Sequence, residues 1–340
     1  MANASEQELL DRYALAGAAS AKVQGWASGA RMFAVLRGLQ ERGWFRFLDR
    51  PRERVELFEF SGLASVQFDD VLAVLDAHGV VEQEAGTVRL AASFAELVAD
   101  DASIGLDEIL DASVLGIEQS RAAVAPGTTP LTERDALVVA RGSGGRANDI
   151  TKLVYEEYWL VYLPEVSEAL RTGRFLDVGC GVATTSLTLA RIFPETSVLG
   201  IDVVPAVVDE ARRRAEALGV QDRAEFRCVD AQEFDEVDGF GTAFWAQPFF
   251  PEGTRAKTLA AIYRALHPGG LLILQELMPP PGDEAKLPAY TLRQLAIRST
   301  GRPFGSTAEE LVAEAESAGF ILVRIALADS ERYVIMQRPS

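Results

Sequence analysis

The sequence predicts an α/β protein in which a mainly parallel sheet with an antiparallel last strand follows a mainly helical N-terminal domain. Three observations lead to this fold class. The apolar segment at residues 174–183, RFLDVGCGVA, runs into two glycines and then into an amphipathic helical pattern. Further apolar segments alternate with helical patterns as far as residue 277, which is typical of parallel strands joined by crossover helices. The last two apolar segments are joined by a turn too short for a crossover, so we expect them to pair antiparallel.

The segment at residues 174–183 is the most informative part of the chain. Its apolar residues suit a buried parallel strand, and Gly179 and Gly181 allow the backbone to turn tightly against a ligand. The third glycine of the dinucleotide fingerprint would fall at Thr184, which argues against a nicotinamide or flavin cofactor. The segment therefore predicts a strand, a ligand-binding glycine turn and a helix.

Carboxylates close three successive predicted strands, at Asp177, Asp202 and Asp230. Asp202, which Val203 follows, is expected beside the glycine turn, where its carboxylate can accept both hydroxyls of a ribose. Asp230 can accept from an adenine amine while Ala231 offers its backbone N–H. The alternative for Asp202 is a solvent-exposed helix N-cap.

These segments resemble the class I S-adenosylmethionine-dependent methyltransferases, whose first motif has the D-x-G-x-G form seen in DVGCG. The resemblance covers roughly residues 153–338 and continues through FGTAFWAQPFF at residues 240–250 and the LHPGG turn before the next strand. It implies a Rossmann-like methyltransferase sheet and S-adenosylmethionine as cofactor. The cofactor-binding residues implied are Asp177, Gly179, Gly181, Asp202, Val203, Asp230, Ala231 and Trp245.

The length of 340 residues and the 48% hydrophobic content fit two domains. We expect a helical, winged-helix-like domain at residues 1–125, a linker or lid at 126–152, and the cofactor domain at 153–340. Residues 68–91 predict a helix followed by two short strands, which is a winged-helix pattern. The polar positions of that helix are largely acidic and would repel phosphates, so DNA binding is disfavoured.

A winged-helix-like region before such a domain resembles the small-molecule O-methyltransferases of plant phenolic and bacterial antibiotic pathways. In that family the first domain builds a homodimer and closes part of the acceptor pocket. By this resemblance, helices around residues 9–19 and 26–39 would interlock with a second subunit. The alternative is that they pack only within the monomer.

A glycine-rich stretch at residues 142–145 precedes a helix that carries Tyr155, Tyr158, Trp159 and Tyr162. Flexible glycines beside an aromatic helix suit a lid over a mostly apolar ligand, and an ordinary interdomain linker is the alternative. We take Tyr158 as a candidate catalytic hydroxyl and Trp159 and Tyr162 as candidate substrate contacts.

Methyl transfer is a direct displacement, so the protein must hold the acceptor in line and exclude water. The resemblance implies a histidine base in the loop after the fourth strand, but Gln247 and Pro248 stand there, and neither accepts a proton at neutral pH. Glu276 matches the family position that steadies the histidine. We therefore expect Glu276 and Gln247 at the catalytic site, with Phe249 and Phe250 as substrate contacts.

The missing histidine leaves several reactions open. We expect the acceptor to be a small molecule, best matched by an aromatic or apolar natural product. Either this acceptor needs little help from a base, or Glu276 or a tyrosine acts as the base. The remaining alternative is an S-adenosylmethionine-binding enzyme that transfers no methyl group, of the hydroxylase or pericyclase type.

Composition excludes several other classes. A net charge of −17 argues against a nucleic-acid partner, and the N-terminus has no apolar run for a signal peptide or membrane span. We expect a cytoplasmic protein with no membrane partner. Two cysteines make a disulfide framework improbable, and two isolated histidines predict no metal site.

Overall fold

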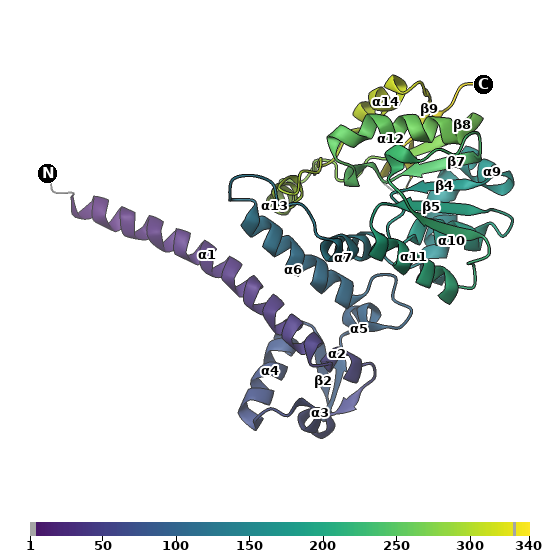
Figure 1. Cartoon of the computed structure of the whole chain (residues 1–340). Coiled ribbons are helices and arrows are strands. Elements are labelled where there is room, and N and C mark those ends of the chain that lie inside the picture. The colour runs from purple at the N-terminus through teal and green to yellow at the C-terminus, as the bar shows by residue number, and fades with distance from the viewer. Residues whose placement is uncertain (1–4, 329–330) are drawn as a thin grey trace. The chain divides into compact units, whose positions relative to one another are not determined.

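The computed structural model describes residues 5–328 and 331–340, and the chain divides into two compact units, Met1–Asp100 and Asp101–Ser340 (Figure 1). The boundary lies earlier than residue 125, where the sequence predicted it. The reason is packing, because α6 (Leu106–Ala122) and α7 (Glu133–Gly144) contact helices of the second unit. None of the helices in the described ranges is long and apolar enough to cross a membrane.

The first unit is mainly helical. Its elements are α1 (Glu6–Glu41), α2 (Trp44–Phe47), β1 (Arg52–Glu53), α3 (Arg54–Ser61), α4 (Ser65–Ala77), β2 (Val81–Glu84), β3 (Thr87–Leu90) and α5 (Ala92–Val98). The helix and hairpin predicted over residues 68–91 are present as α4, β2 and β3. Phe68, Leu72 and Leu75 bury one face of α4, and the strands form a sheet in the order β1-β3-β2.

The first helix differs from the prediction of two helices near residues 9–19 and 26–39. A single helix, α1, runs through both segments, because a capping box starts it and no proline interrupts it. The amide of Glu8 donates to Ser5 Oγ at 3.2 Å, and the amide of Ser5 donates to Glu8 Oε2 at 2.7 Å. Glycines within the helix lower its stability without ending it.

The second unit holds the predicted sheet. Its elements after α6 and α7 are α8 (Asp149–Val154), α9 (Pro164–Thr172), β4 (Phe175–Val178), α10 (Thr184–Ile192), β5 (Val198–Asp202), α11 (Pro205–Ala217), β6 (Ala224–Cys228), β7 (Phe240–Trp245), α12 (Glu252–Ala265), β8 (Leu266–Gln275), α13 (Leu287–Arg298), α14 (Ala308–Ser317), β9 (Ile321–Ala328) and β10 (Glu331–Gln337). The strand order is β6-β5-β4-β7-β8-β10-β9. Strands β4 to β8 run parallel, and β10 pairs antiparallel with both β8 and β9, as the short final turn predicted.

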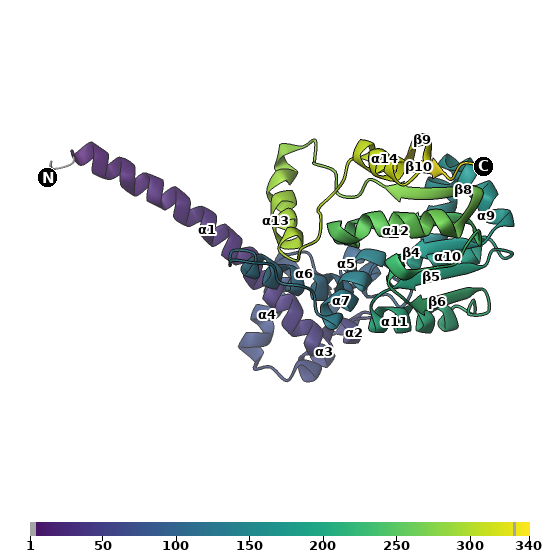
Figure 2. The ribbon, with the colours of Figure 1, turned by 45° about the horizontal axis from the view of Figure 1, so that its top comes forward.

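Helices cover both faces of this sheet. Side chains alternate along the strands, so that Phe175 packs with α9, α10 and α11 on one face, while Leu176 packs with α12 and α14 on the other. The helices that cover the two faces are labelled in Figures 1 and 2. A further group of helices forms beside the sheet, where α6 contacts α7 and α13 (Figure 2). These layers leave the carboxyl ends of the parallel strands as the edge where a ligand site is expected.

Two glycine segments differ from their predicted forms. Residues 142–144 form the last turn of α7 rather than a flexible stretch. The glycines are there because the helix packs closely against its neighbours and leaves no space for larger side chains. A Cβ on Gly142 would lie 2.9 Å from the Cβ of Ala112, and one on Gly144 would lie 3.0 Å from Val182 Cγ2. The LHPGG segment belongs to β8, where the pairing with β7 shifts register after Phe240.

Candidate active site

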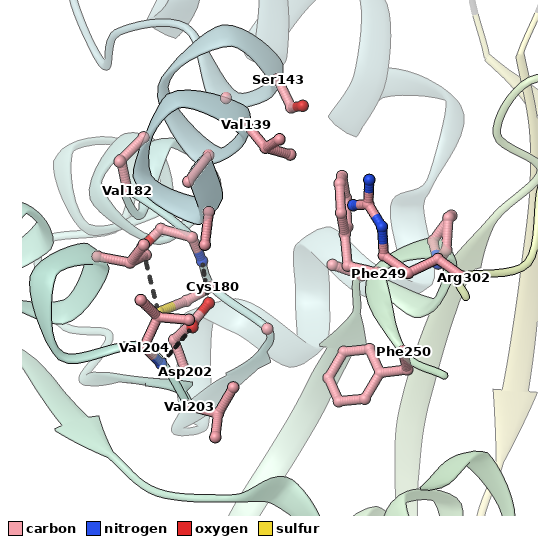
Figure 3. Close-up of a pocket in the computed structure, with 18 of the residues that line it drawn as sticks. Val139, Ser143, Cys180, Val182, Asp202, Val203, Val204, Phe249, Phe250 and Arg302 are labelled. Carbon is pink, nitrogen blue, oxygen red and sulfur yellow. Dashed lines mark hydrogen bonds between the residues drawn. The ribbon is translucent and has the colours of Figure 1, made fainter. Parts of the chain in front are cut away.

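A cavity of about 1000 Å³ opens at the carboxyl ends of the parallel strands, and every residue that lines it belongs to the second unit. The glycine turn after β4 and the ends of β5 and β6 form one part of its wall. Segments after β7 and β8, residues of α7 and of the loop before it, Tyr155, Arg293, Thr300 and Arg302 also line it. Figure 3 shows Cys180 and Asp202 on one side of the cavity, with Phe249, Phe250 and Arg302 on the other.

The glycine turn adopts the backbone conformation that its residues predicted. Gly179 and Gly181 have φ angles of 75° and 55°, in the left-handed region that glycine occupies without strain. A Cβ on Gly179 would lie 2.7 Å from Phe250 Cε2. The turn therefore brings bare backbone to the cavity and leaves no space for a side chain at residue 179.

Asp202 ends β5 and orients its carboxylate toward the same turn. Its Oδ2 accepts from the amide of Gly181 at 3.2 Å, and its Oδ1 accepts from the amide of Val204 at 3.0 Å. Burial raises the pKa of Asp202, and the backbone hydrogen bonds oppose that shift. Each carboxylate oxygen retains a lone pair for a further donor, as a ribose diol requires.

Asp177 and Asp230 reach the cavity in different environments. Asp177 is buried, its Oδ2 accepts from Ser186 Oγ at 2.6 Å, and burial raises its pKa to about 7. Asp230 lies after β6, where its Oδ1 accepts from the amide of Gln232 at 2.9 Å. Val203 and Ala231 also line the cavity, so the structure brings together seven of the eight expected cofactor residues.

Trp245 is the exception, because it lies in the core and does not line the cavity. Side chains alternate at the end of β7, so its neighbours Phe244 and Ala246 face the cavity instead. Trp245 packs 4.8 Å from the guanidinium carbon of Arg255 and edge-on to Phe250 at 5.5 Å. It supports the wall from behind.

Gln247 and Glu276 also lie away from the cavity, contrary to the catalytic roles expected for them. Gln247 is buried and donates to the carbonyl of Gln275 at 3.2 Å. Glu276 Oε1 accepts from the amide of Ala308 at 2.9 Å and from Arg332 Nη1 at 3.2 Å. The side chain of Glu276 therefore holds the first turn of α14, while its neighbours on either side, residues 275 and 277, line the cavity.

The aromatic segment after α8 presents a different face from the one expected. It forms a π-helical turn, Tyr155–Trp159, in which Tyr155 lines the cavity and donates to or accepts from Thr185 Oγ1 at 2.9 Å. Trp159, one turn on, is buried 5.1 Å from Tyr155. Tyr158 and Tyr162 lie on the opposite, exposed face, so none of the three residues chosen from the sequence reaches the cavity. Phe249 and Phe250 do line it, as expected.

Several lining residues carried little sequence signal. Val139 and Ser143 come from α7, in the segment predicted as a linker or lid without a helix, and Arg302 comes from a loop with no motif. Tyr155 could have been found from its four-residue spacing to Trp159, which places both on one helical face. Loop residues such as Arg302 could not, because no periodicity governs their direction.

Neither histidine lines the cavity. His78 follows α4 in the first unit, and His267 Nδ1 lies 2.9 Å from the carbonyl oxygen of Pro268. Within residues 5–328 and 331–340, no three His, Cys, Asp or Glu side chains are placed to hold a metal ion. Burial raises the pKa of Tyr155 to about 12 and that of the Cys180 thiol well above its ordinary value, so both groups stay protonated at neutral pH.

Residues 175–270, which contain the glycine turn and all three acids, match the family model described as a methyltransferase domain. The chain contains a class I S-adenosylmethionine-dependent methyltransferase domain. This confirms the family, the fold and the cofactor that the DVGCG motif predicted.

The curated relatives of the chain include two enzymes that illustrate its range. The demethylmenaquinone methyltransferase of Thermus thermophilus is 37% identical over 109 residues, which are 32% of this chain and 49% of the relative. An S-adenosyl-L-methionine-dependent Diels-Alderase of Talaromyces variabilis is 31% identical over 159 residues, which are 44% of this chain and 53% of the relative. The chain thus spans about half the length of these relatives.

The solved structure of human N-acetylserotonin methyltransferase in complex with S-adenosylmethionine is similar in fold. The TM-score is 0.69 at 15% sequence identity, and the match covers 100% of both chains. At this identity the likeness shows the fold alone, and it extends over the helical first unit as well as the methyltransferase domain.

Proposed function

We propose that this protein transfers the methyl group of S-adenosylmethionine to a small aromatic or apolar acceptor by direct displacement, without a histidine base. One observation carries the proposal. The glycine turn and the three strand-end acids share a single cavity with an apolar wall that includes Phe249, Phe250 and Met278. A polar end suited to a nucleoside and an apolar end suited to an acceptor are what such a transfer needs.

The residues at the polar end fit the cofactor. When bound, S-adenosylmethionine supplies an electrophilic methyl carbon on a sulfonium. Asp202 has lone pairs left for the ribose hydroxyls, and Asp230 with the amide of Ala231 offers an acceptor and a donor for the adenine. The bare backbone of Gly179 and Gly181 allows close approach, and the negative field of the acids favours a cation.

At the apolar end the chain acts mainly by positioning. Phe249 and Phe250 offer flat apolar surfaces against which an aromatic acceptor can lie, and they exclude water from the reacting atoms. No histidine lines the cavity, and Tyr155 stays protonated, so an acceptor that is already nucleophilic suits this site best. Amines, enolisable carbons, carboxylates and acidic phenols meet that requirement.

The alternative is an enzyme that holds S-adenosylmethionine without transferring its methyl group. The sequence similarity to the S-adenosyl-L-methionine-dependent Diels-Alderase favours this second reading. The two functions differ in one product, because only methyl transfer converts the cofactor to S-adenosylhomocysteine.

Two experiments test the proposal. The first is calorimetry of the whole chain with S-adenosylmethionine, and the second is incubation with methyl-labelled cofactor and a panel of phenols, amines, enols and carboxylic acids. We expect cofactor binding and labelled product, and we expect Asp202→Ala to lose about tenfold to a hundredfold in cofactor affinity, because it removes an acceptor for both ribose hydroxyls. Binding without any S-adenosylhomocysteine would favour the non-methylating alternative. Unchanged affinity in Asp202→Ala would refute the cofactor assignment.

We also propose that the protein is a homodimer built through α1. The support is the exposure of large apolar side chains along this helix, where Leu10, Tyr13 and Trp26 are 56%, 81% and 72% exposed. Large apolar side chains left exposed along a helix are typical of a surface that a partner covers. Light scattering of the whole chain should give twice the monomer mass, and a monomeric mass at micromolar concentration would refute the proposal.

A further inference from the structure

Charged groups in the cavity wall are separated by sign. The four acids, Glu133, Asp177, Asp202 and Asp230, come from residues 133–230 at the polar end. The two cations, Arg293 and Arg302, come from α13 and the loop that follows it. Figure 3 shows Arg302 beside Phe249, on the opposite side of the cavity from Asp202. Although the net charge of the chain is −17, two arginines therefore line the part of the cavity where the acceptor would bind.

Arg302 is a half-buried cation with no carboxylate partner among the described residues. Its Nε donates to Thr300 Oγ1 at 3.0 Å, and its guanidinium carbon lies 5.8 Å from the centre of the Phe249 ring. Burial lowers the pKa of Arg302, and no neighbouring acid offsets this shift. The terminal nitrogens of the guanidinium therefore remain available to a ligand.

Two other arginines removed from solvent in the same unit, by contrast, have carboxylate partners. Arg255 donates to Glu314 Oε1 at 2.6 Å, and Arg214 donates to Glu210 Oε1 at 2.9 Å. A desolvated cation without a partner is unfavourable, so its retention in a ligand cavity indicates that a ligand supplies the anion.

The loop that carries Arg302 is held in place. The amide of Thr129 donates to the carbonyl of Ser299 at 2.9 Å, and Thr300 Oγ1 donates to the carbonyl of Ile297 at 2.7 Å. Gly305 has a φ of +66°, and a Cβ there would lie 2.9 Å from the carbonyl oxygen of Met278, so the loop packs directly on the segment after β8. Arg302 is therefore oriented before any ligand binds.

We propose that the acceptor is an anionic aromatic molecule whose carboxylate pairs with Arg302, with Phe249 against its ring. This inference rests on the proposed methyl transfer and names its substrate class. A guanidinium offers two parallel N–H donors to a carboxylate, and Arg293, which is exposed at the cavity wall, adds attraction at longer range. The carboxylate provides recognition, and the methyl group goes to another atom of the ring system.

The test compares acids with their amides. Protein saturated with S-adenosylhomocysteine is titrated calorimetrically with benzoate, salicylate, 3-hydroxybenzoate and indole-3-carboxylate, and separately with the four matching carboxamides. The amides keep the shape and lose the charge. At least one acid should bind about tenfold to a hundredfold more tightly than its amide, the range expected for a charge-assisted hydrogen bond in a partly dry site.

Variants assign the preference to one side chain. Arg302→Gln should reduce the affinity of the acid to that of the amide, and Arg302→Lys should retain part of the preference, because it keeps the charge without the planar fork. Arg298→Gln is the matched control, since Arg298 is exposed at the end of α13 and does not line the cavity. Cofactor affinity measured on each variant reports whether the site still folds.

The outcomes separate the two proposals. If S-adenosylhomocysteine binds but no acid is preferred over its amide, or if Arg302→Lys and Arg302→Gln both keep the full preference, the carboxylate proposal is overturned and the methyl-transfer proposal stands. If the wild-type chain binds neither S-adenosylmethionine nor S-adenosylhomocysteine, both proposals are overturned.

Discussion

The buried carboxyl of Asp177 should make the stability of the second unit depend on pH. Burial raises its pKa from 3.8 to about 7, with Asp202 adding repulsion and the Ser186 hydrogen bond opposing the shift. The folded state therefore favours the protonated acid. Stabilisation from Asp177 is fully present below pH 3.8, and it is lost progressively as the pH rises to about 7.

The magnitude follows from the shift. A difference of about three units between the folded and unfolded pKa corresponds to about 4 kcal/mol, at about 1.4 kcal/mol for each unit. Asp177→Asn keeps an oxygen that can accept from Ser186 and never ionises. We expect the free energy of unfolding of the wild type, relative to Asp177→Asn, to fall by up to about 4 kcal/mol between about pH 4 and pH 7.

Urea unfolding of the cofactor-free chain, followed by tryptophan fluorescence to which Trp159 and Trp245 of the second unit contribute, measures this difference. Asp222→Asn is the control, because Asp222 is exposed and its substitution should give a difference that is flat in this pH range. A wild-type minus Asp177→Asn difference that stays constant from pH 5 to pH 7, or that rises with pH, would refute the reasoning, because this interval lies inside the window of about pH 4 to 7 in which the contribution of Asp177 is lost.

Two further predictions concern residues around the cavity. Gly179→Ala should weaken S-adenosylmethionine binding by at least about tenfold in calorimetry, because a Cβ would lie 2.7 Å from Phe250 Cε2 at a φ of +75°; an unchanged affinity would show that the turn tolerates a side chain. Glu276→Gln should lower the free energy of unfolding by about 1–3 kcal/mol, because the contacts with Ala308 and Arg332 lose a charge, and should leave cofactor affinity within about twofold. If the variant were as stable as the wild type but lost cofactor binding, Glu276 would have a role in binding the cofactor and not only in stability.

Two of the expected site residues, Trp245 and Glu276, lie at strand ends and do not line the cavity, for one physical reason. At the end of β7 the side chains of Phe244 and Ala246 face the cavity while Trp245 faces the core, and residues 275 and 277 stand in the same relation to Glu276. A shift of one residue reverses the face of every side chain, and the register of a strand end is set by its neighbours in the sheet. Sequence pattern identifies the strand but does not decide which of two adjacent residues meets the ligand.

The helical segment at residues 155–162 shows that the same limit of sequence patterns applies to helices. Four aromatic side chains within eight residues predict that one face is buried, and the π-helical turn put Tyr155 and Trp159 there while Tyr158 and Tyr162 became exposed. Which face of a helix is covered depends on the elements that pack against it.

The sequence alone determined the alternating strands and helices, the glycine turn, and the three acids that meet at one edge of the sheet. These features follow from local periodicity, from backbone conformations that only glycine adopts easily, and from the rule that parallel strands end together. Only the tertiary structure decided that Val139 and Ser143 of α7 line the cavity, and that Arg302 reaches it without a carboxylate partner among the described residues. Those outcomes depend on how segments more than 100 residues apart in the sequence, such as those of Gly181 and Arg302, come to line one cavity, which no local pattern encodes.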